Sequence, residues 1–195
     1  MSGNFSLSSR NSARLIVRKE PTPFRDYTAA SIGSRHSHLY GRFEAEIKAA
    51  KGAGLVTGLF LHRNTPRQEI DIEILGKDTT KMLVNVFYNP GSDGANFDYG
   101  YRGTPALIEL GFDAAKEFHR YSIDWSPTSI RWSIDGRLVH ERASWNPTPI
   151  PNLPMQFYIS LWPSRSKELA GRLSDDELPA QSEVRVINLL VRPFL

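Results

Sequence analysis

Three carboxylates stand at alternate positions in the segment QEIDIEILGKDTT, residues 68–80: Glu69, Asp71 and Glu73. Isoleucines fill the positions between them, an alternation typical of a β-strand with one acidic face and one apolar face. Neighbouring carboxylates then lie about 6.6 Å apart along the strand, from a rise of about 3.3 Å per residue. Like charges at this spacing raise at least one carboxyl pKa, and strands disfavour Asp and Glu intrinsically. The row is therefore either a solvated strand face or a site of chemistry.

Three kinds of role fit this pattern: a solvated face, metal ligation, and acid/base catalysis by paired carboxylates. The apolar opposite face and the core-type neighbouring segments favour a cleft over bulk water. A retaining glycosidase needs a nucleophile and an acid/base whose carboxyl groups lie about 5–5.5 Å apart. The Cα atoms of Glu69 and Glu73 are about 13 Å apart over four strand rises, a gap that long side chains can largely close. Asp71 between them could orient the nucleophile by a hydrogen bond.

Short alternating segments separated by turn residues surround this strand, and long helical periodicity is absent from the sequence. The turn spacing predicts an all-β sandwich of two packed antiparallel sheets, with at least nine strands. Helical structure is expected only as single turns near 113–118 and within 163–182. Trp125 and Trp132 alternate in phase with isoleucines, which predicts that both pack in the core. The predicted strands cover residues 13–20, 40–49, 54–63, 69–75, 81–88, 119–125, 129–136, 137–142, 155–162 and 183–191.

Composition excludes several other classes of protein. The chain has 195 residues, 40% of them hydrophobic, which suits one domain over 1–195 with its own core. Its 24 Lys and Arg against 21 Asp and Glu are scattered, so no nucleic-acid partner is expected. Without cysteine there is neither a disulfide nor a thiolate metal site. The sequence has no apolar run of about 18 residues, so no membrane span is predicted. The first residues also lack the apolar region of a signal peptide.

The segment EIDIEILGKDTT resembles the catalytic signature Glu-x-Asp-x-Glu of glycoside hydrolase family 16, and most closely that of bacterial licheninases, which are endo-β-1,3-1,4-glucanases. Three further blocks resemble the family in the same order: YGRFEAEIKAAKGAGLVTGLF, GFDAAKEFHRYSIDWSPTSIRWSIDGRLVH and ISLW. Family branches that act on laminarin, agarose or carrageenan usually carry one extra residue before the last Glu. The uninterrupted spacing here resembles the branch of licheninases and xyloglucan-active enzymes.

The resemblance implies a concanavalin A-like jelly-roll β-sandwich whose concave cleft binds an extended β-glucan. It implies an endo-acting retaining hydrolase in which Glu69 is the nucleophile, Asp71 the assisting carboxylate and Glu73 the acid/base, with a pKa raised by its neighbours. No organic cofactor is required; a structural calcium occurs in the family, but no motif here identifies its ligands. A monomer is expected, located outside the cell or in the cell envelope. A xyloglucan-type transglycosylase with the same triad is an alternative, as is a non-catalytic carbohydrate-binding sandwich.

The resemblance also suggests substrate-binding residues. Glu44, Phe60, Asn85 and Trp162 stand where licheninases have cleft residues, and Phe87 replaces a tyrosine there. Aromatic side chains in a sugar cleft stack on pyranose faces. The alternative is structural for each: Phe60 and Phe87 as core residues, and Glu44 as a solvated strand residue.

Two departures from the family pattern add cations to the expected cleft. Arg67 stands where licheninases have a tryptophan, and His62 stands where they have a tyrosine. Fixed cations attract carboxylated sugars, which suggests an acidic or substituted β-glucan such as a bacterial exopolysaccharide as substrate. The alternative is that both are solvated loop residues. The chain also looks about one strand shorter than the family at its beginning, so it is expected to be a domain of a longer protein.

Overall fold

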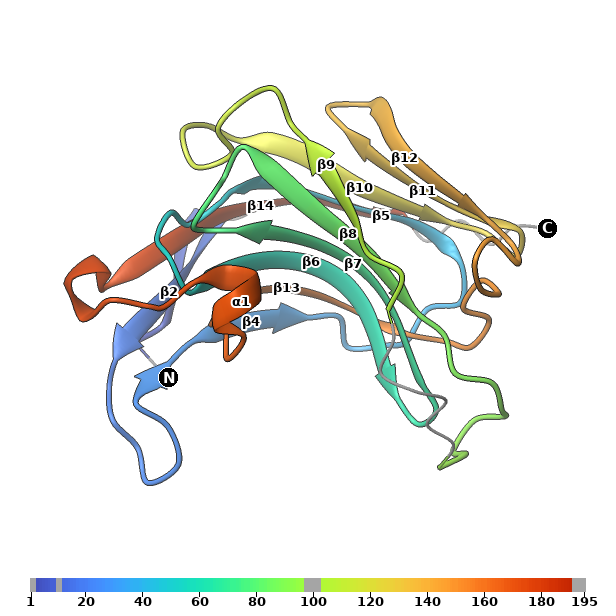
Figure 1. Cartoon of the computed structure of the whole chain (residues 1–195), viewed down its shortest axis with the longest axis horizontal. Helices are drawn as coiled ribbons and strands as arrows, with labels where there is room; N and C mark the ends of the chain where they lie inside the picture. The colour runs from blue at the N-terminus through green and yellow to red at the C-terminus, as the bar shows by residue number, and fades with distance from the viewer. Residues whose placement is uncertain (1–2, 10–11, 97–102, 191–195) are drawn as a thin grey trace.

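A computed structural model describes residues 3–9, 12–96 and 103–190 of the chain. It has two antiparallel β-sheets packed face to face, so the predicted fold class, an all-β sandwich, is confirmed. The strands of the two sheets curve in the same direction, so that the outer face of the six-stranded sheet is concave (Figure 1). Within the residues described, no helix is long and apolar enough to cross a membrane.

The six-stranded sheet carries the acidic strand near its centre, with every neighbouring pair antiparallel. Its order is β4 (Ala30–Gly33), β13 (Gln156–Pro163), β6 (Leu55–Asn64), β7 (Arg67–Leu75), β8 (Lys81–Phe87) and β9 (Ala106–Glu109). Strand β7 follows β6 through the turn at residues 65–66 and pairs with it along its whole length. The acidic row is thus flanked on both sides by long strands, which fix its position in the sheet and the face toward which its side chains point.

The eight-stranded sheet covers the inner face of the first. Its order is β1 (Phe5–Ser9), β2 (Ser12–Lys19), β14 (Ala180–Leu190), β5 (Gly41–Lys48), β10 (His119–Trp125), β11 (Ser129–Ile134) and β12 (Arg137–Ala143), with β3 (Tyr27–Thr28) paired to β2. Strand β5 shows the alternation of a half-buried strand, since every second side chain is buried.

The hydrophobic core lies between the two sheets. Ile70, Ile72 and Ile74 of β7 are at most 1% exposed, which fixes the register of the strand, because a slip by one residue would turn the carboxylates inward. Trp125 and Trp132 are both fully buried, so their predicted core placement is confirmed. The indole Nε1 of Trp132 donates a hydrogen bond of 3.1 Å to the backbone oxygen of Asp71, and so ties the opposite sheet to the acidic strand.

The strands of the prediction are all present, within a few residues at their ends. The prediction did not include β1, β3, β4 and β9, which have only two to five residues each and so give too short a pattern to identify. The helical turn expected near 113–118 is wrong, because this segment forms a non-helical turn. Within 163–182 the chain forms the α-helix α1 (Lys167–Ala170), capped by Ser166, and the 3₁₀ helix η1 (Asp175–Glu177).

Candidate active site

The three carboxylates lie on the concave face of the six-stranded sheet and line one cavity of about 430 Å³. Across the ladder, Glu69 is paired with His62 and Phe87, Asp71 with Phe60 and Asn85, and Glu73 with Gly58 and Leu83. The other side chains that line the cavity come from β4, β6, β13 and the residue before β4: Ala29, Ala30, Ser31, Phe60, Ser160, Leu161 and Trp162. The acidic row therefore faces a cavity rather than a flat solvated surface.

The three carboxyl groups have different ionisation properties. Burial raises the pKa of Glu73 to about 7, and the charge of Glu69 adds to this effect. Burial, together with the charges of Glu69 and Glu73, raises the pKa of Asp71 well above its usual range. Burial also acts to raise the pKa of Glu69, but the contacts with His62 and Arg67 outweigh it and hold this pKa below the ordinary value. Near neutral pH the row thus holds one ionised carboxylate and two groups that retain protons more readily.

Two cationic side chains account for the low pKa of Glu69. Arg67, two residues earlier on β7, places Nε 3.0 Å and Nη2 2.5 Å from Oε2 of Glu69. His62 on β6 places Nδ1 3.4 Å from Oε1, and this contact raises the pKa of the imidazole. Both residues were predicted in the cleft, and the structure brings both onto the side chain of Glu69.

An aromatic strip runs across the strands beside the acidic row. The ring of Phe60 lies 5.3 Å from that of Tyr158 in a stacked arrangement and 6.1 Å from that of Trp162 in an edge-on one. The indole of Trp162 covers Gly58, where a Cβ atom would lie 2.7 Å from the ring. Glycine at position 58 thus allows Trp162 to lie close to the sheet beside Glu73. Phe60 and Trp162, predicted in the cleft, both line the cavity, and their binding of substrate stays a prediction.

Asn85 and Phe87 lie on the other side of the row, on β8. Both side chains are half-buried and share the concave face of the sheet, because Val84 and Val86, which alternate with them, are buried. The guanidinium carbon of Arg67 lies 4.2 Å from the centre of the Phe87 ring, a cation–π contact. The placement of Phe60 and Phe87 in the core, the alternative considered above, does not hold for either.

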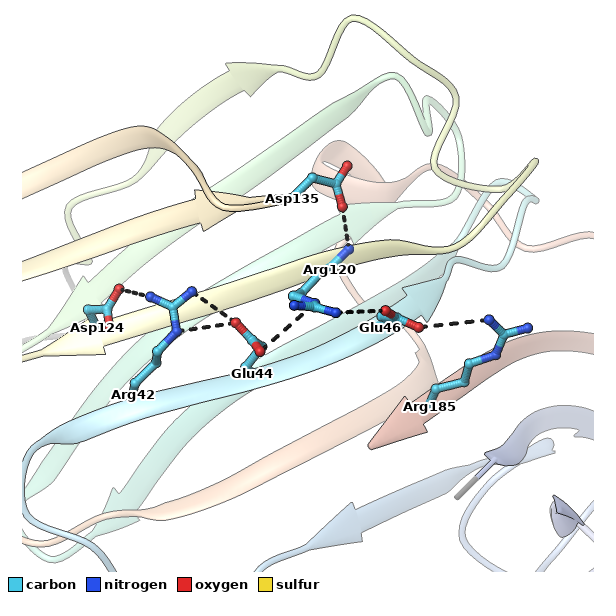
Figure 2. Close-up of polar contacts among 7 residues, drawn as sticks. All are labelled: Arg42, Glu44, Glu46, Arg120, Asp124, Asp135 and Arg185. Atoms are coloured by element: carbon cyan, nitrogen blue, oxygen red, sulfur yellow. Dashed lines mark hydrogen bonds and ion pairs between the residues drawn. The ribbon is translucent and has the colours of Figure 1, made fainter. Parts of the chain in front are cut away.

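The prediction that Glu44 lies in the cleft is wrong. Glu44 is on β5 of the eight-stranded sheet, where Phe43 and Ala45 point into the core and Glu44 points away from it. Its carboxylate contacts Arg42 at 2.9 Å and Arg120 at 3.9 Å, within a row of ion pairs on the outer face of that sheet (Figure 2). The strand alternation assigns Glu44 to the face opposite the core, but the sequence does not reveal which of the two sheets contains the strand.

Three residues of the site escaped the sequence analysis. Tyr158 extends the aromatic strip, with its hydroxyl donating a 2.6 Å hydrogen bond to Gln156, and Ser31 and Ser160 line the cavity with their hydroxyls 2.6 Å apart. Tyr158, Ser160 and Trp162 alternate along one strand, a period-2 signal that could have identified the first two from the third.

The part of the chain that the structure describes contains no group of three or more His, Cys, Asp and Glu side chains arranged to hold a metal ion. Glu69, the first carboxylate of the row, contacts an arginine and a histidine instead, and such cationic partners suit a carboxylate rather than a site for a divalent cation. A structural calcium bound through backbone oxygens stays a prediction.

The fold and the site together define a class of β-sandwich proteins that carry a row of carboxylates on a concave sheet. Residues 2–176 match the family described as glycosyl hydrolases family 16, and the chain belongs to this family. It is 34% identical over 163 residues to a beta-glucanase of Bacillus licheniformis; the match covers 82% of this chain and 60% of the relative. The chain thus matches less than two thirds of the length of that relative.

Two solved structures share the fold along most of the chain. One is a prokaryotic beta-1,3-1,4-glucanase (lichenase) derived from a mouse hindgut metagenome, with a TM-score of 0.77 and 27% identity, covering 94% of this chain and 80% of that one. The other is the Crh5 transglycosylase in complex with NAG, with a TM-score of 0.69 and 27% identity, covering 96% and 80%.

Proposed function

We propose that the protein is an endo-acting, retaining β-glucan hydrolase that cleaves β-1,3-1,4-glucan or a related bacterial β-glucan. The observation that carries this proposal is that two carboxyl groups on one face of β7 ionise differently. Contacts with Arg67 and His62 lower the pKa of Glu69, so it is ionised, while Glu73, with a pKa of about 7, retains its proton up to near neutral pH. A nucleophile and a general acid on one face of a cleft are the two groups that a double displacement at an anomeric carbon requires.

The proposed reaction has two steps. Glu69 attacks the anomeric carbon, and the departing sugar oxygen takes the proton of Glu73, which leaves a glycosyl-enzyme ester and the carboxylate of Glu73. Water then attacks the same carbon, gives its proton to Glu73 and releases the carboxylate of Glu69. Asp71 lies between the two glutamates on the same face, and its raised pKa favours the protonated form, which can donate a hydrogen bond. The reaction requires no organic cofactor.

The substrate class is supported by the site and by the relatives. The strip formed by Trp162, Phe60 and Tyr158 offers flat apolar faces beside the acidic row, as pyranose rings require. The relative named beta-glucanase and the lichenase structure support a β-glucan as the class of polysaccharide. By the same resemblance we propose that the protein acts as a monomer, outside the cell or in its envelope.

A transglycosylase is the second candidate, because the Crh5 transglycosylase shares the fold. The same carboxylates would then act identically in the first step, and a sugar hydroxyl would replace water in the second. The two functions are separated by the products, because a transglycosylase lengthens some chains where a hydrolase only shortens them.

The test is the release of reducing ends with sizing of the products. Mixed-linkage β-glucan, xyloglucan, laminarin and an acidic exopolysaccharide are compared, each with and without an added oligosaccharide acceptor. The proposal expects oligosaccharides from mixed-linkage β-glucan without acceptor. Products longer than the donor, formed only with acceptor, would favour the transglycosylase. Cleavage restricted to the acidic polymer would instead support the hypothesis drawn from Arg67 and His62. No reaction of the folded protein with any polymer would contradict the proposal.

A further inference from the structure

The two oxygens of the Glu69 carboxylate lie in different surroundings. Oε2 accepts hydrogen bonds from both Nε and Nη2 of Arg67, at 3.0 and 2.5 Å. A carboxylate oxygen has two lone pairs in its plane, so these two bonds engage Oε2 fully. The ring of Phe87 supports the guanidinium at 4.2 Å, which holds it in place against the carboxylate.

Oε1 is much less engaged. Its cationic neighbour is Nδ1 of His62 at 3.4 Å, too long for a strong hydrogen bond, although protonated His62 forms an ion pair there. The other ring nitrogen of His62, Nε2, lies 2.8 Å from Oδ1 of Asn64, which fixes the ring. Among the residues described, the charged or titratable groups around Glu69 are Arg67, Asp71 and Glu73 from β7 and His62 from β6, and the β8 residue paired with Glu69 is the uncharged Phe87.

From this geometry we infer that Oε1 is the attacking oxygen, and that Arg67 is a positioning residue that holds Oε2 as the carbonyl oxygen of the glycosyl-enzyme and speeds its breakdown. The inference rests on the proposed function. In the first step Oε1 forms the bond to the anomeric carbon and Oε2 becomes the ester carbonyl, still bonded to Arg67. In the second step the bond between Oε1 and the anomeric carbon breaks, and its electron pair returns to Glu69.

The direction of the effect follows from where charge develops. The carboxylate loses its negative charge in the first step and regains it in the second. A cation fixed beside Oε2 therefore slows attack and favours departure, since it stabilises whichever state carries the charge. Arg67 thus keeps the second step from limiting turnover, and its loss should make the glycosyl-enzyme accumulate.

The test compares Arg67→Met and Arg67→Lys with the unaltered protein on an aryl β-glucan oligosaccharide that has a good leaving group. With Arg67→Met, kcat should fall roughly 10- to 100-fold, the range for loss of hydrogen bonding to a charged group, while kcat/KM, which reports the first step, should not fall. A burst of the aryl leaving group should precede the steady state, and the glycosyl-enzyme should be visible by intact-protein mass spectrometry. Arg67→Lys keeps the charge and should restore part of kcat.

A matched control is Arg131→Met, which breaks an arginine–glutamate contact of 3.0 Å on the opposite sheet, with Glu141, and should change neither the burst nor the kinetic constants. Thermal unfolding followed by circular dichroism verifies that each variant is folded. An equal fall of kcat and kcat/KM in Arg67→Met, without a burst, would overturn the inference, and so would unchanged kinetics.

A second readout does not depend on turnover. The pKa of Glu69, measured by NMR with ¹³C-labelled glutamate, should rise in Arg67→Met and stay unchanged in Arg131→Met. A pKa that does not move would overturn the contact itself. If the unaltered protein turned over no glucan while the pKa of Glu69 still depended on Arg67, the proposed function would fail, and the second-step role with it, but the contact would stand.

Discussion

Two rows of charged side chains lie on the outer faces of the two sheets, and they are built in opposite ways. The row in the cleft has one sign and follows one strand, β7. The row on the other sheet runs along β5, takes partners from its neighbours β10 and β14, and alternates in sign (Figure 2). Its order is Asp124, Arg42, Glu44, Arg120, Glu46 and Arg185, with neighbouring opposite charges 2.7–3.9 Å apart.

The difference shows that charged side chains can be placed either in pairs that are compatible with a stable fold or in a buried row whose pKa values are shifted. In the alternating row every carboxylate has a guanidinium partner, so the row is electrostatically satisfied and partly solvated. In the cleft row, burial and like charge raise the pKa of Asp71 and Glu73, and only Glu69 is given cationic partners. The cleft row therefore costs folding free energy at neutral pH, and the same burial and like charge keep a proton on Glu73, as its proposed role as the acid requires.

The largest expected effect distinguishes the two rows by the same substitution. Glu69→Gln removes the proposed nucleophile, and β-glucan hydrolysis should fall by roughly 10³-fold or more. Glu44→Gln makes the same chemical change in the alternating row and should leave activity within a factor of about 2. Reducing-end assays and thermal unfolding of both variants check this. Normal turnover by Glu69→Gln, or a large loss in Glu44→Gln, would erase the distinction.

The second effect concerns the pH dependence of activity. Glu73 must be protonated to act as the acid, so kcat/KM should decline above its pKa of about 7, while the lowered pKa of Glu69 moves the acid limb below the ordinary range for glutamate. Glu73→Gln should lose roughly 10²- to 10⁴-fold in rate, less on substrates with a good leaving group, and should lose the alkaline limb. An alkaline limb retained in Glu73→Gln would show that another group supplies the proton.

The third effect is on stability. Because burial raises the pKa of Glu73 from its ordinary 4.5 to about 7, the unfolded chain ionises first as the pH rises. Burial of Glu73 therefore lowers the free energy of unfolding. This loss is absent below pH 4.5, grows between pH 4.5 and 7, and reaches about 3 kcal/mol, because each unit of pKa shift corresponds to about 1.36 kcal/mol. Glu73→Gln should therefore become more stable than the unaltered protein over this range, as urea unfolding at several pH values would reveal. A stability difference that does not vary with pH would contradict the raised pKa.

The smallest effect should come from the alternating row. Arg42→Met removes contacts with Glu44 and Asp124, both on the partly solvated outer face. Surface ion pairs of this kind contribute about 0–1 kcal/mol each, and less at high salt. Urea unfolding at low and high salt should show a loss of about 1 kcal/mol that shrinks with salt, with no change in activity. A loss of several kcal/mol in the free energy of unfolding would contradict the view that this row consists of weak, partly solvated ion pairs.

The same contrast explains how much the sequence could predict. Alternation in EIDIEIL is a local signal, and it placed Glu69, Asp71 and Glu73 on one face and the three isoleucines in the core. The long strands and the two buried tryptophans followed from the same period. The short strands at or beside the sheet edges, such as β4 and β9, were missed because two to five residues give too little pattern.

Which sheet contains a strand is set by long-range pairing, and a single strand pattern does not encode it. That is why Glu44, predicted in the cleft, lies on the opposite sheet. The attachment of Arg67 and His62 to opposite oxygens of Glu69 was equally invisible, because it depends on side-chain directions across two strands. Both cations were singled out as departures from a family pattern, but for a role with the substrate.

The most direct test of the central claim is to trap the covalent intermediate and find the residue that carries it. The probe is a 2-deoxy-2-fluoro β-glucan oligosaccharide with a dinitrophenolate leaving group. The fluorine slows both steps, and the good leaving group offsets this in the first step only, so the glycosyl-enzyme accumulates. Peptic digestion and tandem mass spectrometry then locate the sugar. A single label on Glu69 is the expected result. A label on Asp71 or Glu73, or no label together with inversion at the anomeric carbon, would contradict it.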